Sequence, residues 1–156
     1  MDDFEKFYNS SLRFLSYRPR SEKEVREKLL SKKASAEIIQ KVIDKLKEHR
    51  FLDDLEFSLW FFEQRTKVRP KALRIIKIEL RRKGISEEIM EKVMNDKGLM
   101  INDLDSAKKL LERKFDKYKS MERNEIYKKL GSFLARRGFD WDTTKKAIDE
   151  IFDKGV

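Results

Sequence analysis

Residues 18–43 read RPRSEKEVREKLLSKKASAEIIQKVI, and residues 69–94 read RPKALRIIKIELRRKGISEEIMEKVM. Both segments begin with Arg-Pro, and a shift of 51 residues superposes their apolar positions, as it does for Leu29 and Leu80. A further shift of 54 residues carries Leu80 onto Leu134. A single register that matches at apolar positions indicates three copies of one unit of about 50 residues.

Each copy is predicted to contain three helices. Apolar residues recur at spacings of three and four, which is typical of one face of a helix. The first helix should end at Arg18-Pro19, because a residue before proline avoids the helical conformation. Ser21 and Glu24 then have the spacing of a capping box, and Gly84 fits the left-handed residue that follows a second helix.

We therefore predict an all-α fold of three tandem three-helix repeats that form an elongated, curved solenoid. The predicted repeats cover residues 1–52, 53–98 and 99–156. A long coiled coil is the competing fold, but Arg-Pro and Lys-Gly breaks interrupt any heptad pattern.

The composition supports helices and excludes several kinds of site. The chain has 156 residues with 5 Gly and 2 Pro, fewer turn formers than a β-sandwich or barrel needs. It has no Cys and one His, His49, so we expect no disulfide, no metal and no cofactor. No apolar run approaches the roughly 20 residues of a membrane span, and the N-terminus does not resemble a secretory signal. These features predict a cytoplasmic protein without membrane contact.

The charge predicts an anionic partner. Lys and Arg number 38 against 29 Asp and Glu, which gives a net charge of +9, so a polyanion or an acidic protein surface is expected. Residues 65–83 hold nine cations and a single acid, Glu79, so we expect most of these cations to lack an acidic partner. Arg74, Lys77 and Arg81 share one helix face at i, i+3 and i+7. A solvated helix face is the competing interpretation.

Ten cations are the candidate contacts to phosphates or to a partner's carboxylates. They are Lys71, Arg74, Lys77, Arg81, Arg82, Lys83, Arg136, Arg137, Arg18 and Arg20.

Aromatic and acidic clusters have structural interpretations beside functional ones. The aromatic group Phe57, Trp60, Phe61 and Phe62 could stack on bases, but its helical spacing favours the core, with one of Phe57 and Phe61 exposed. Asp53 begins a helix and is interpreted as a cap. No phosphate-binding loop or nucleophile elbow is present, so we predict that the protein is not an enzyme.

Several segments resemble the RecX family of bacterial recombination regulators. Residues 14–25, FLSYRPRSEKEV, are similar to the opening signature of that family. The family's second block is matched by Phe51-Leu52-Asp53-Asp54 with Phe57 and Arg65. Its third block is matched by Arg74, Glu79-Leu80 and Lys83-Gly84-Ile85. The chain departs from the usual pattern at Lys33-Ala34 and at Arg50, where glycine is common, so the turns there are the least predictable.

The resemblance implies tandem three-helix repeats and a non-enzymatic role. RecX proteins bind the RecA recombinase and its filament on single-stranded DNA, and they inhibit its ATPase and strand-exchange activities in recombination and DNA repair. The implied partners are RecA, its filament, single-stranded DNA and, second, double-stranded DNA, and we expect a monomer. Filament capping, groove occupation and disassembly all stay open as mechanisms. The alternative is a free-standing helical nucleic-acid-binding protein that acts without RecA, and a structural scaffold is the third class.

Overall fold

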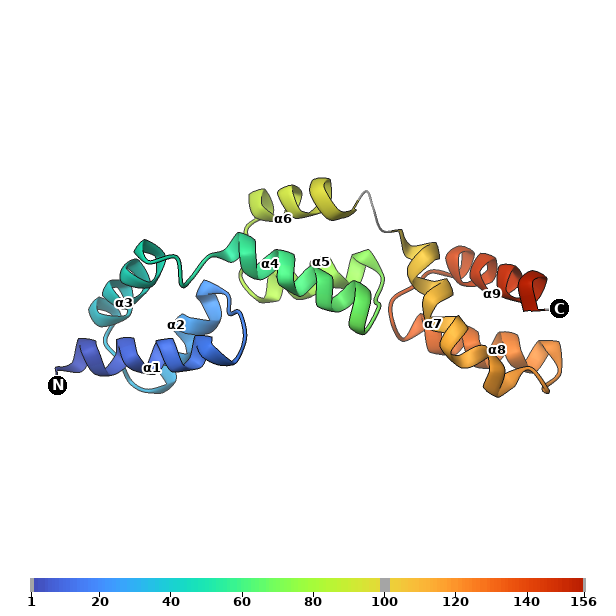
Figure 1. Cartoon of the computed structure of the whole chain (residues 1–156), viewed down its shortest axis with the longest axis horizontal. Helices are drawn as coiled ribbons and strands as arrows, with labels where there is room; N and C mark the ends of the chain where they lie inside the picture. The colour runs from blue at the N-terminus through green and yellow to red at the C-terminus, as the bar shows by residue number, and fades with distance from the viewer. Residues whose placement is uncertain (1, 99–101, 156) are drawn as a thin grey trace. The chain divides into compact units, whose positions relative to one another are not determined.

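The structure, a computed structural model, describes residues 2–98 and 102–155, and this part of the chain consists of helices and connecting turns (Figure 1). It contains nine α-helices, which confirms the predicted all-α class. They are α1 (Asp3–Tyr17), α2 (Glu22–Ser31), α3 (Ala36–Glu48), α4 (Asp54–Glu63), α5 (Leu73–Arg82), α6 (Glu87–Val93), α7 (Asp103–Tyr118), α8 (Arg123–Ala135) and α9 (Trp141–Gly155). No helix in the described ranges is long and apolar enough to cross a membrane.

Two helices continue into π-helical turns that the sequence did not predict. η1 (Gln64–Val68) follows α4, and η2 (Met94–Gly98) follows α6. In η1 the hydroxyl of buried Thr66 donates to the carbonyl of Phe62 at 3.0 Å. A side-chain bond back to the preceding turn competes with the regular helical ladder, which accounts for part of the local irregularity at η1.

The helices of the first repeat begin at polar caps. Asp2 accepts from the N–H of Glu5 at 2.7 Å, and Ser35 accepts from the N–H of Ile38 at 3.2 Å. The predicted capping box is present, because Ser21 and Glu24 each accept the backbone N–H of the other. These caps satisfy donors that a helix leaves free in its first turn.

The first repeat packs around α3. α1 and α2 both pack against α3, and the core includes Val25, Leu29, Ile43 and Leu46, each fully buried. These residues lie on the stripes predicted from the spacing of apolar positions. Leu30, predicted on the same stripe as Val25 and Leu29, is 60% exposed, so the periodicity identified most of the buried face but not all of it.

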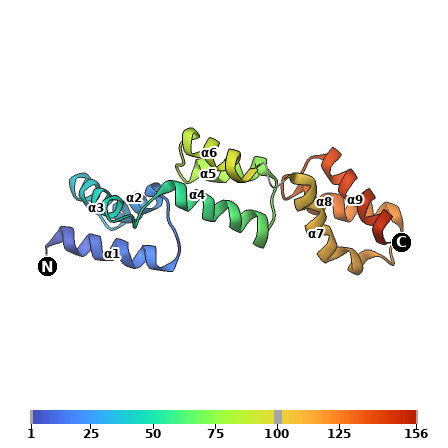
Figure 2. The same ribbon diagram turned by 45° about the horizontal axis from the view of Figure 1, so that its top comes forward.

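The third repeat packs in the same way around α9. α7 and α8 both lie against α9 (Figure 2). Its core includes Leu111, Leu130, Leu134 and Ile148, each fully buried.

By its contacts the chain divides into two compact units. Unit 1 is Met1–Phe61 with Leu80–Val93, and unit 2 is Phe62–Glu79 with Met94–Val156. α4 and α5 are therefore shared, since each contributes residues to both units, whereas α6 lies in unit 1. The predicted repeat boundaries after residues 52 and 98 stay predictions, and so does a curved solenoid. The second boundary borders residues 99–101, which lie outside the described residues.

The turn that follows the second helix of each repeat is left-handed. Gly84 has a φ of +80° and Gly138 a φ of +90°, and at the position equivalent to Gly84 in the first repeat Lys33 has a φ of +65°. Arg50 also keeps a positive φ, of +59°. The two departures from the family pattern therefore preserve the turn geometry, at the cost of a conformation that residues with a Cβ rarely adopt.

Packing explains why glycine is needed at two of these turns. A Cβ on Gly138 would lie 2.2 Å from Cγ1 of Ile75, and one on Gly84 would lie 2.8 Å from Cβ of Lys23. Lys33 is exposed, so its side chain has room.

We predict that Gly138→Ala destabilises the protein by at least about 2 kcal/mol, because it adds a left-handed strain of about 1–2 kcal/mol to overpacking of about 1–3 kcal/mol. Urea denaturation measures the change. Gly131→Ala is the matched control, since that helical glycine would bring its Cβ only to 3.6 Å from Trp141. A similar loss in both variants would contradict this explanation.

Lys33→Gly should stabilise the protein by about 0.5–1 kcal/mol, because relief of left-handed strain exceeds the added entropy of the unfolded chain. The midpoint of urea unfolding measures the effect. Lys32→Gly is the control, since Lys32 has a φ of −91° and no such strain to relieve, and it should destabilise. A loss of stability in Lys33→Gly would refute the strain at this turn.

Candidate functional site

The ten candidate cations divide equally between the two units. Arg18, Arg20, Arg81, Arg82 and Lys83 belong to unit 1, and Lys71, Arg74, Lys77, Arg136 and Arg137 belong to unit 2. Each group surrounds a place where the left-handed turn of one repeat packs against the start of the second helix of the preceding repeat. We call these places junction 1 (residues 18–24 against 82–84) and junction 2 (residues 69–75 against 136–138).

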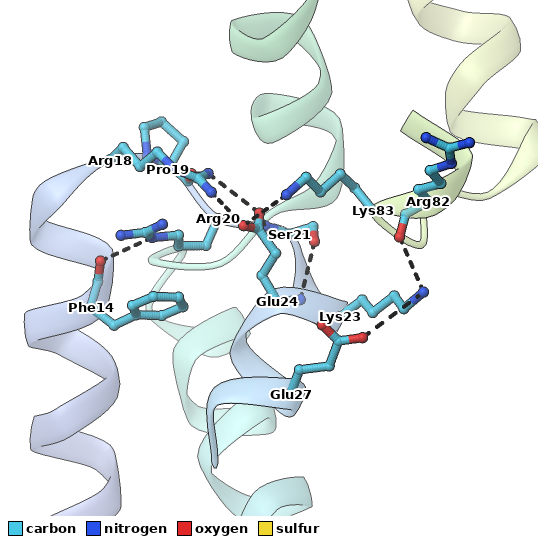
Figure 3. Close-up of polar contacts among 10 residues, drawn as sticks. All are labelled: Phe14, Arg18, Pro19, Arg20, Ser21, Lys23, Glu24, Glu27, Arg82 and Lys83. Carbon is cyan, nitrogen blue, oxygen red and sulfur yellow. Dashed lines mark hydrogen bonds and ion pairs between the residues drawn. The ribbon is translucent and has the colours of Figure 1, made fainter. Parts of the chain in front are cut away.

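Junction 1 is closed by polar contacts on both sides of its turn (Figure 3). Nζ of Lys23 donates to the carbonyl of Arg82 at 3.1 Å. The carboxylate of Glu24 pairs with Arg18 and also with Lys83, whose Nζ lies 3.4 Å away. The Glu24 side chain is 12% exposed, so this carboxylate binds the two cations in a partly desolvated position.

Junction 2 uses main-chain groups more heavily. The N–H of Ala72 donates to the carbonyl of Arg137 at 3.1 Å, and Nη2 of Arg74 donates to the carbonyl of Gly138 at 3.1 Å. Arg74 is exposed overall, but one edge of its guanidinium is engaged in this contact.

The two junctions share one hydrogen-bonding pattern. A shift of 51 residues relates Lys23 to Arg74, and both donate to carbonyls at the turn of the following repeat. The preceding residue in each case donates its backbone N–H to the aspartate that begins the next repeat's first helix. These bonds are Glu22 N–H to Asp54 at 2.8 Å and Leu73 N–H to Asp103 at 2.9 Å. The sequence repeat thus corresponds to a repeated interface.

The environment of Glu24 keeps its carboxylate charged. Burial alone raises the pKa of Glu24, but hydrogen bonds from Arg18 and from the backbone N–H of Ser21, with the nearby charge of Lys83, outweigh it. The pKa of Glu24 therefore lies below its ordinary value, and the ion pairs with both cations persist at neutral pH.

Glu79 neutralises part of the basic segment. Nε of Arg65 lies 2.7 Å and Nζ of Lys71 lies 2.8 Å from its carboxylate oxygens. Burial raises the pKa of Glu79, but the hydrogen bonds from Lys71 and Arg65 outweigh it and leave the pKa below its ordinary value. The one acid that the sequence shows in this segment therefore pairs with two of its cations.

Two candidate arginines lie on aromatic rings within their own repeats. The guanidinium carbon of Arg20 is 3.9 Å from the ring centre of Phe14, and that of Arg137 is 3.9 Å from the ring centre of Phe133. Each arginine also donates to the carbonyl of the residue whose ring it covers. Burial lowers the pKa of both arginines, and a neighbouring arginine lowers each further. These stacks give Arg20 and Arg137 structural roles.

The expectation that most of these cations lack an acidic partner is wrong in part, because acids from outside residues 65–83 reach several of them. Arg81 pairs with Glu87 at 2.8 Å and Lys83 pairs with Glu24, in addition to the pairing of Lys71 with Glu79 inside the segment. Within the described part of the chain, three candidate side chains take part in no ion pair or side-chain hydrogen bond. They are Lys77, Arg82 and Arg136; Arg82 and Arg136 are exposed and Lys77 is half-buried.

The aromatic group before the basic helix belongs to the core, as its spacing favoured. Phe57, Phe61 and Phe62 are all buried, so the expectation that Phe57 or Phe61 is exposed is wrong. α4 contributes residues to both units, and a helix that is apolar all round is buried on most of its circumference. Trp60 is half-buried, with the guanidinium of Arg18 5.7 Å from its ring centre.

The acids that could suggest a metal site cap helices instead. Asp53 accepts from the N–H of Leu55 at 2.9 Å, as the capping interpretation predicted. In the described residues there is no group of three or more side chains that could hold a metal ion.

Trp141 is an exposed aromatic residue that the sequence analysis missed. Its side chain is 59% exposed at the first position of α9, whereas Ala147, Ile148 and Ile151 are buried. Its exposure could have been predicted from the sequence, because Trp141 lies outside the apolar stripe that contains these three residues.

Comparison with known proteins identifies the chain. Two family models match it: RecX, first three-helix domain, over residues 8–46, and RecX, third three-helix domain, over residues 102–148. A regulatory protein RecX from Clostridium tetani is 35% identical, with 96% of this chain matching 69% of that protein. The chain belongs to the RecX family.

Other RecX proteins match over nearly their full length. The regulatory protein RecX of Prosthecochloris aestuarii is 33% identical to this chain. The match covers 96% of this chain and 95% of that protein. A crystal structure of RecX from Lactobacillus salivarius is 27% identical, with a TM-score of 0.74 over 96% of this chain and 97% of that one. These relatives agree with the three-helix repeats described above.

Glu24→Gln should lower the stability of this RecX protein by about 1–2 kcal/mol at pH 7, because the cap and two ion pairs lose their charge. A carboxylate with a lowered folded-state pKa stabilises the fold above its unfolded pKa of about 4.3 and loses that effect as pH falls through the folded pKa. The difference from wild type should therefore be constant between about pH 6 and 8 and shrink as the pH falls below the unfolded pKa.

Urea midpoints across this pH range measure the difference. Glu27→Gln is the control, since Glu27 is exposed and, among residues 2–98 and 102–155, pairs only with Lys23, at 4.0 Å; it should cost less than about 0.5 kcal/mol. A pH-independent deficit in Glu24→Gln would show that the charge is not responsible.

Proposed function

We propose that this protein regulates the RecA recombinase by binding its filament on single-stranded DNA and inhibiting ATP hydrolysis and strand exchange. The proposal is supported by membership of the RecX family over 96% of the chain, among relatives named as regulatory proteins. It needs no chemical step by the protein itself, because occupying the surface of a polymer is enough to change the polymer's activity.

The cations without acidic partners are the proposed contacts. Lys77, Arg82 and Arg136 leave their charge available for phosphates or for carboxylates of a protein partner, where charge-assisted hydrogen bonds are strong. Other candidates are already engaged and are assigned a structural contribution within their own units. Acids hold Arg18, Lys71, Arg81 and Lys83, and aromatic rings hold Arg20 and Arg137. Arg74 takes part in both, since it is exposed and also closes junction 2.

The proposed complex requires one copy of the chain. Each unit carries its own junction and its own group of cations, so a monomer offers two groups to a repetitive partner. The place of action that follows is the cytoplasm, where the filament forms.

We predict that the protein inhibits the ATPase activity of RecA on single-stranded DNA at substoichiometric ratios. The measurement is a titration of the purified protein into a RecA ATPase assay with a fixed DNA concentration. No inhibition at one protein per RecA protomer would refute the proposal.

Charge reversal of Lys77 and Arg136 together should raise the concentration needed for half-inhibition by at least about tenfold, because two charge-assisted contacts become repulsive. The same ATPase titration measures the effect. Lys109→Glu with Lys117→Glu is the matched control, since it makes the same change in net charge at exposed positions on α7 of the same unit. Equal loss in both double variants would leave only non-specific electrostatics and remove these two residues from the mechanism.

Inhibition also has to be separated from simple competition for DNA. Affinity for DNA alone falls by about 0.9 log units per log unit of salt for each duplex phosphate neutralised. A regulator of RecA should inhibit at salt concentrations where its own DNA binding is too weak to account for the effect, whereas a free-standing nucleic-acid binder should lose both together.

A further inference from the structure

The third repeat contains an open cavity that the basic clusters do not use. It lies between α8 and the start of α9, within unit 2, and has a volume of about 520 Å³. Its lining consists of Tyr127, Lys128, Gly131, Ser132, Ala135 and Trp141. Four of the five α8 residues, from Lys128 to Ala135, are spaced at i, i+3, i+4 and i+7, so they form one helix face. Three of these four are small, and Tyr127 is the fifth.

Trp141 forms a wall of this cavity with much of its indole ring in solvent. The ring rests on Gly131, where an added Cβ would be 3.6 Å from its Cζ3 atom. The carboxylate of Asp140 accepts from the N–H of Thr143 at 2.8 Å and so fixes the first turn of α9. The ring is therefore held in place by the helix start and the glycine while the rest of its surface, with 59% of the residue exposed, is free.

One cation lines the cavity, and two more are close to its lining residues along the helices. Lys128 lines it, Lys145 lies one turn after Trp141 on α9, and Arg136 follows Ala135. All three are exposed, and none forms an ion pair in the described part of the chain.

The nearby carboxylates are mostly engaged elsewhere. Asp149 accepts from the hydroxyl of Tyr127, and Asp140 caps α9. Asp142 follows Trp141 but projects about 100° further around the helix. The cavity therefore presents the exposed ring of Trp141 beside Tyr127, with the charge of Lys128 in its lining.

This combination selects a planar, anionic ligand. An amphipathic helix docks into a groove through aliphatic anchors, and no Leu, Ile, Val or Met lines this cavity. A DNA duplex hides the faces of its bases. Bases of a single strand stack on exposed aromatic rings while cations hold the adjoining phosphates.

We propose that the cavity of Trp141 binds a nucleobase of a single-stranded nucleic acid by stacking on the indole ring, with Lys128 and Lys145 contacting the flanking phosphates. The site is separate from junction 1 and adds a base contact to a surface otherwise made of charge. The inference does not depend on RecA, since it concerns the chain and the nucleic acid alone.

Binding of a fluorescent oligothymidine of about 12 nucleotides to the full chain tests the proposal by anisotropy, with an abasic oligomer of equal length as the second probe. Trp141→Ala should weaken oligothymidine binding by about 5- to 150-fold, the range for loss of one stacked base, and leave abasic binding unchanged. Tyr17→Ala is the control, since that exposed aromatic residue lies in unit 1 and should change neither affinity. Circular dichroism checks that both variants are folded.

Tryptophan fluorescence gives a direct readout of the same contact. In a Trp60→Phe background, Trp141 is the single tryptophan of the chain. Its emission should be quenched by the oligothymidine and not by the abasic oligomer.

The phosphate contacts have a test of their own. Lys128→Ala with Lys145→Ala should weaken binding of both oligomers, and should do so more than Lys109→Ala with Lys117→Ala, which removes the same charge from α7.

Three results would overturn the proposal: unchanged oligothymidine affinity in Trp141→Ala, equal loss for both oligomers in that variant, or unchanged emission on binding. Each of these could occur while RecA inhibition is intact, and RecA inhibition could fail while base stacking is observed. The two proposals are therefore distinguished by separate measurements.

Discussion

The repeated contact between a left-handed turn and the start of the preceding repeat's second helix is the constraint on which the rest of the structure depends. At junction 2 the turn approaches so closely that Gly138 has no room for a Cβ. That proximity brings carbonyls of the turn to Ala72 and Arg74. Packing and hydrogen bonding thus reinforce one another, and each of the two compact units contains one such junction.

The junctions also explain how a chain with so much positive charge remains folded. Cations gather there because carbonyls at the end of a helix attract them, and half-buried carboxylates such as Glu24 and Glu79 offset their repulsion. The cations that remain without such partners are the contacts that we propose for binding. Cations that are paired with acids and cations that we propose for binding therefore alternate along the same segments. Whether a cation has an acidic partner separates the two groups better than its position in the sequence does.

Much of the fold was predictable because it depends on local patterns. The apolar stripes, the Ser21 capping box and the turn at Gly84 are each encoded within a few residues, so the sequence indicated all three. The ion pairs were not predictable, since Glu24 and Lys83 are 59 residues apart and meet only through packing of successive repeats. The exposure of Trp141 and the burial of both Phe57 and Phe61 likewise depend on which neighbours cover a helix. The two π-helical turns were not predicted, because the spacing of apolar residues does not distinguish a π-helical turn from an α-helical one.

Most junction bonds involve at least one main-chain group, so their geometry survives changes in the side chains around them. Glu22 and Leu73 occupy equivalent positions and differ in every chemical property, yet their amides make the same bond to an aspartate. An architecture joined in this way is modular: a whole three-helix segment could be duplicated or removed by recombination within a gene, and its neighbours would still fit together. Evolution could then change the number of repeats in such a protein without inventing a new interface.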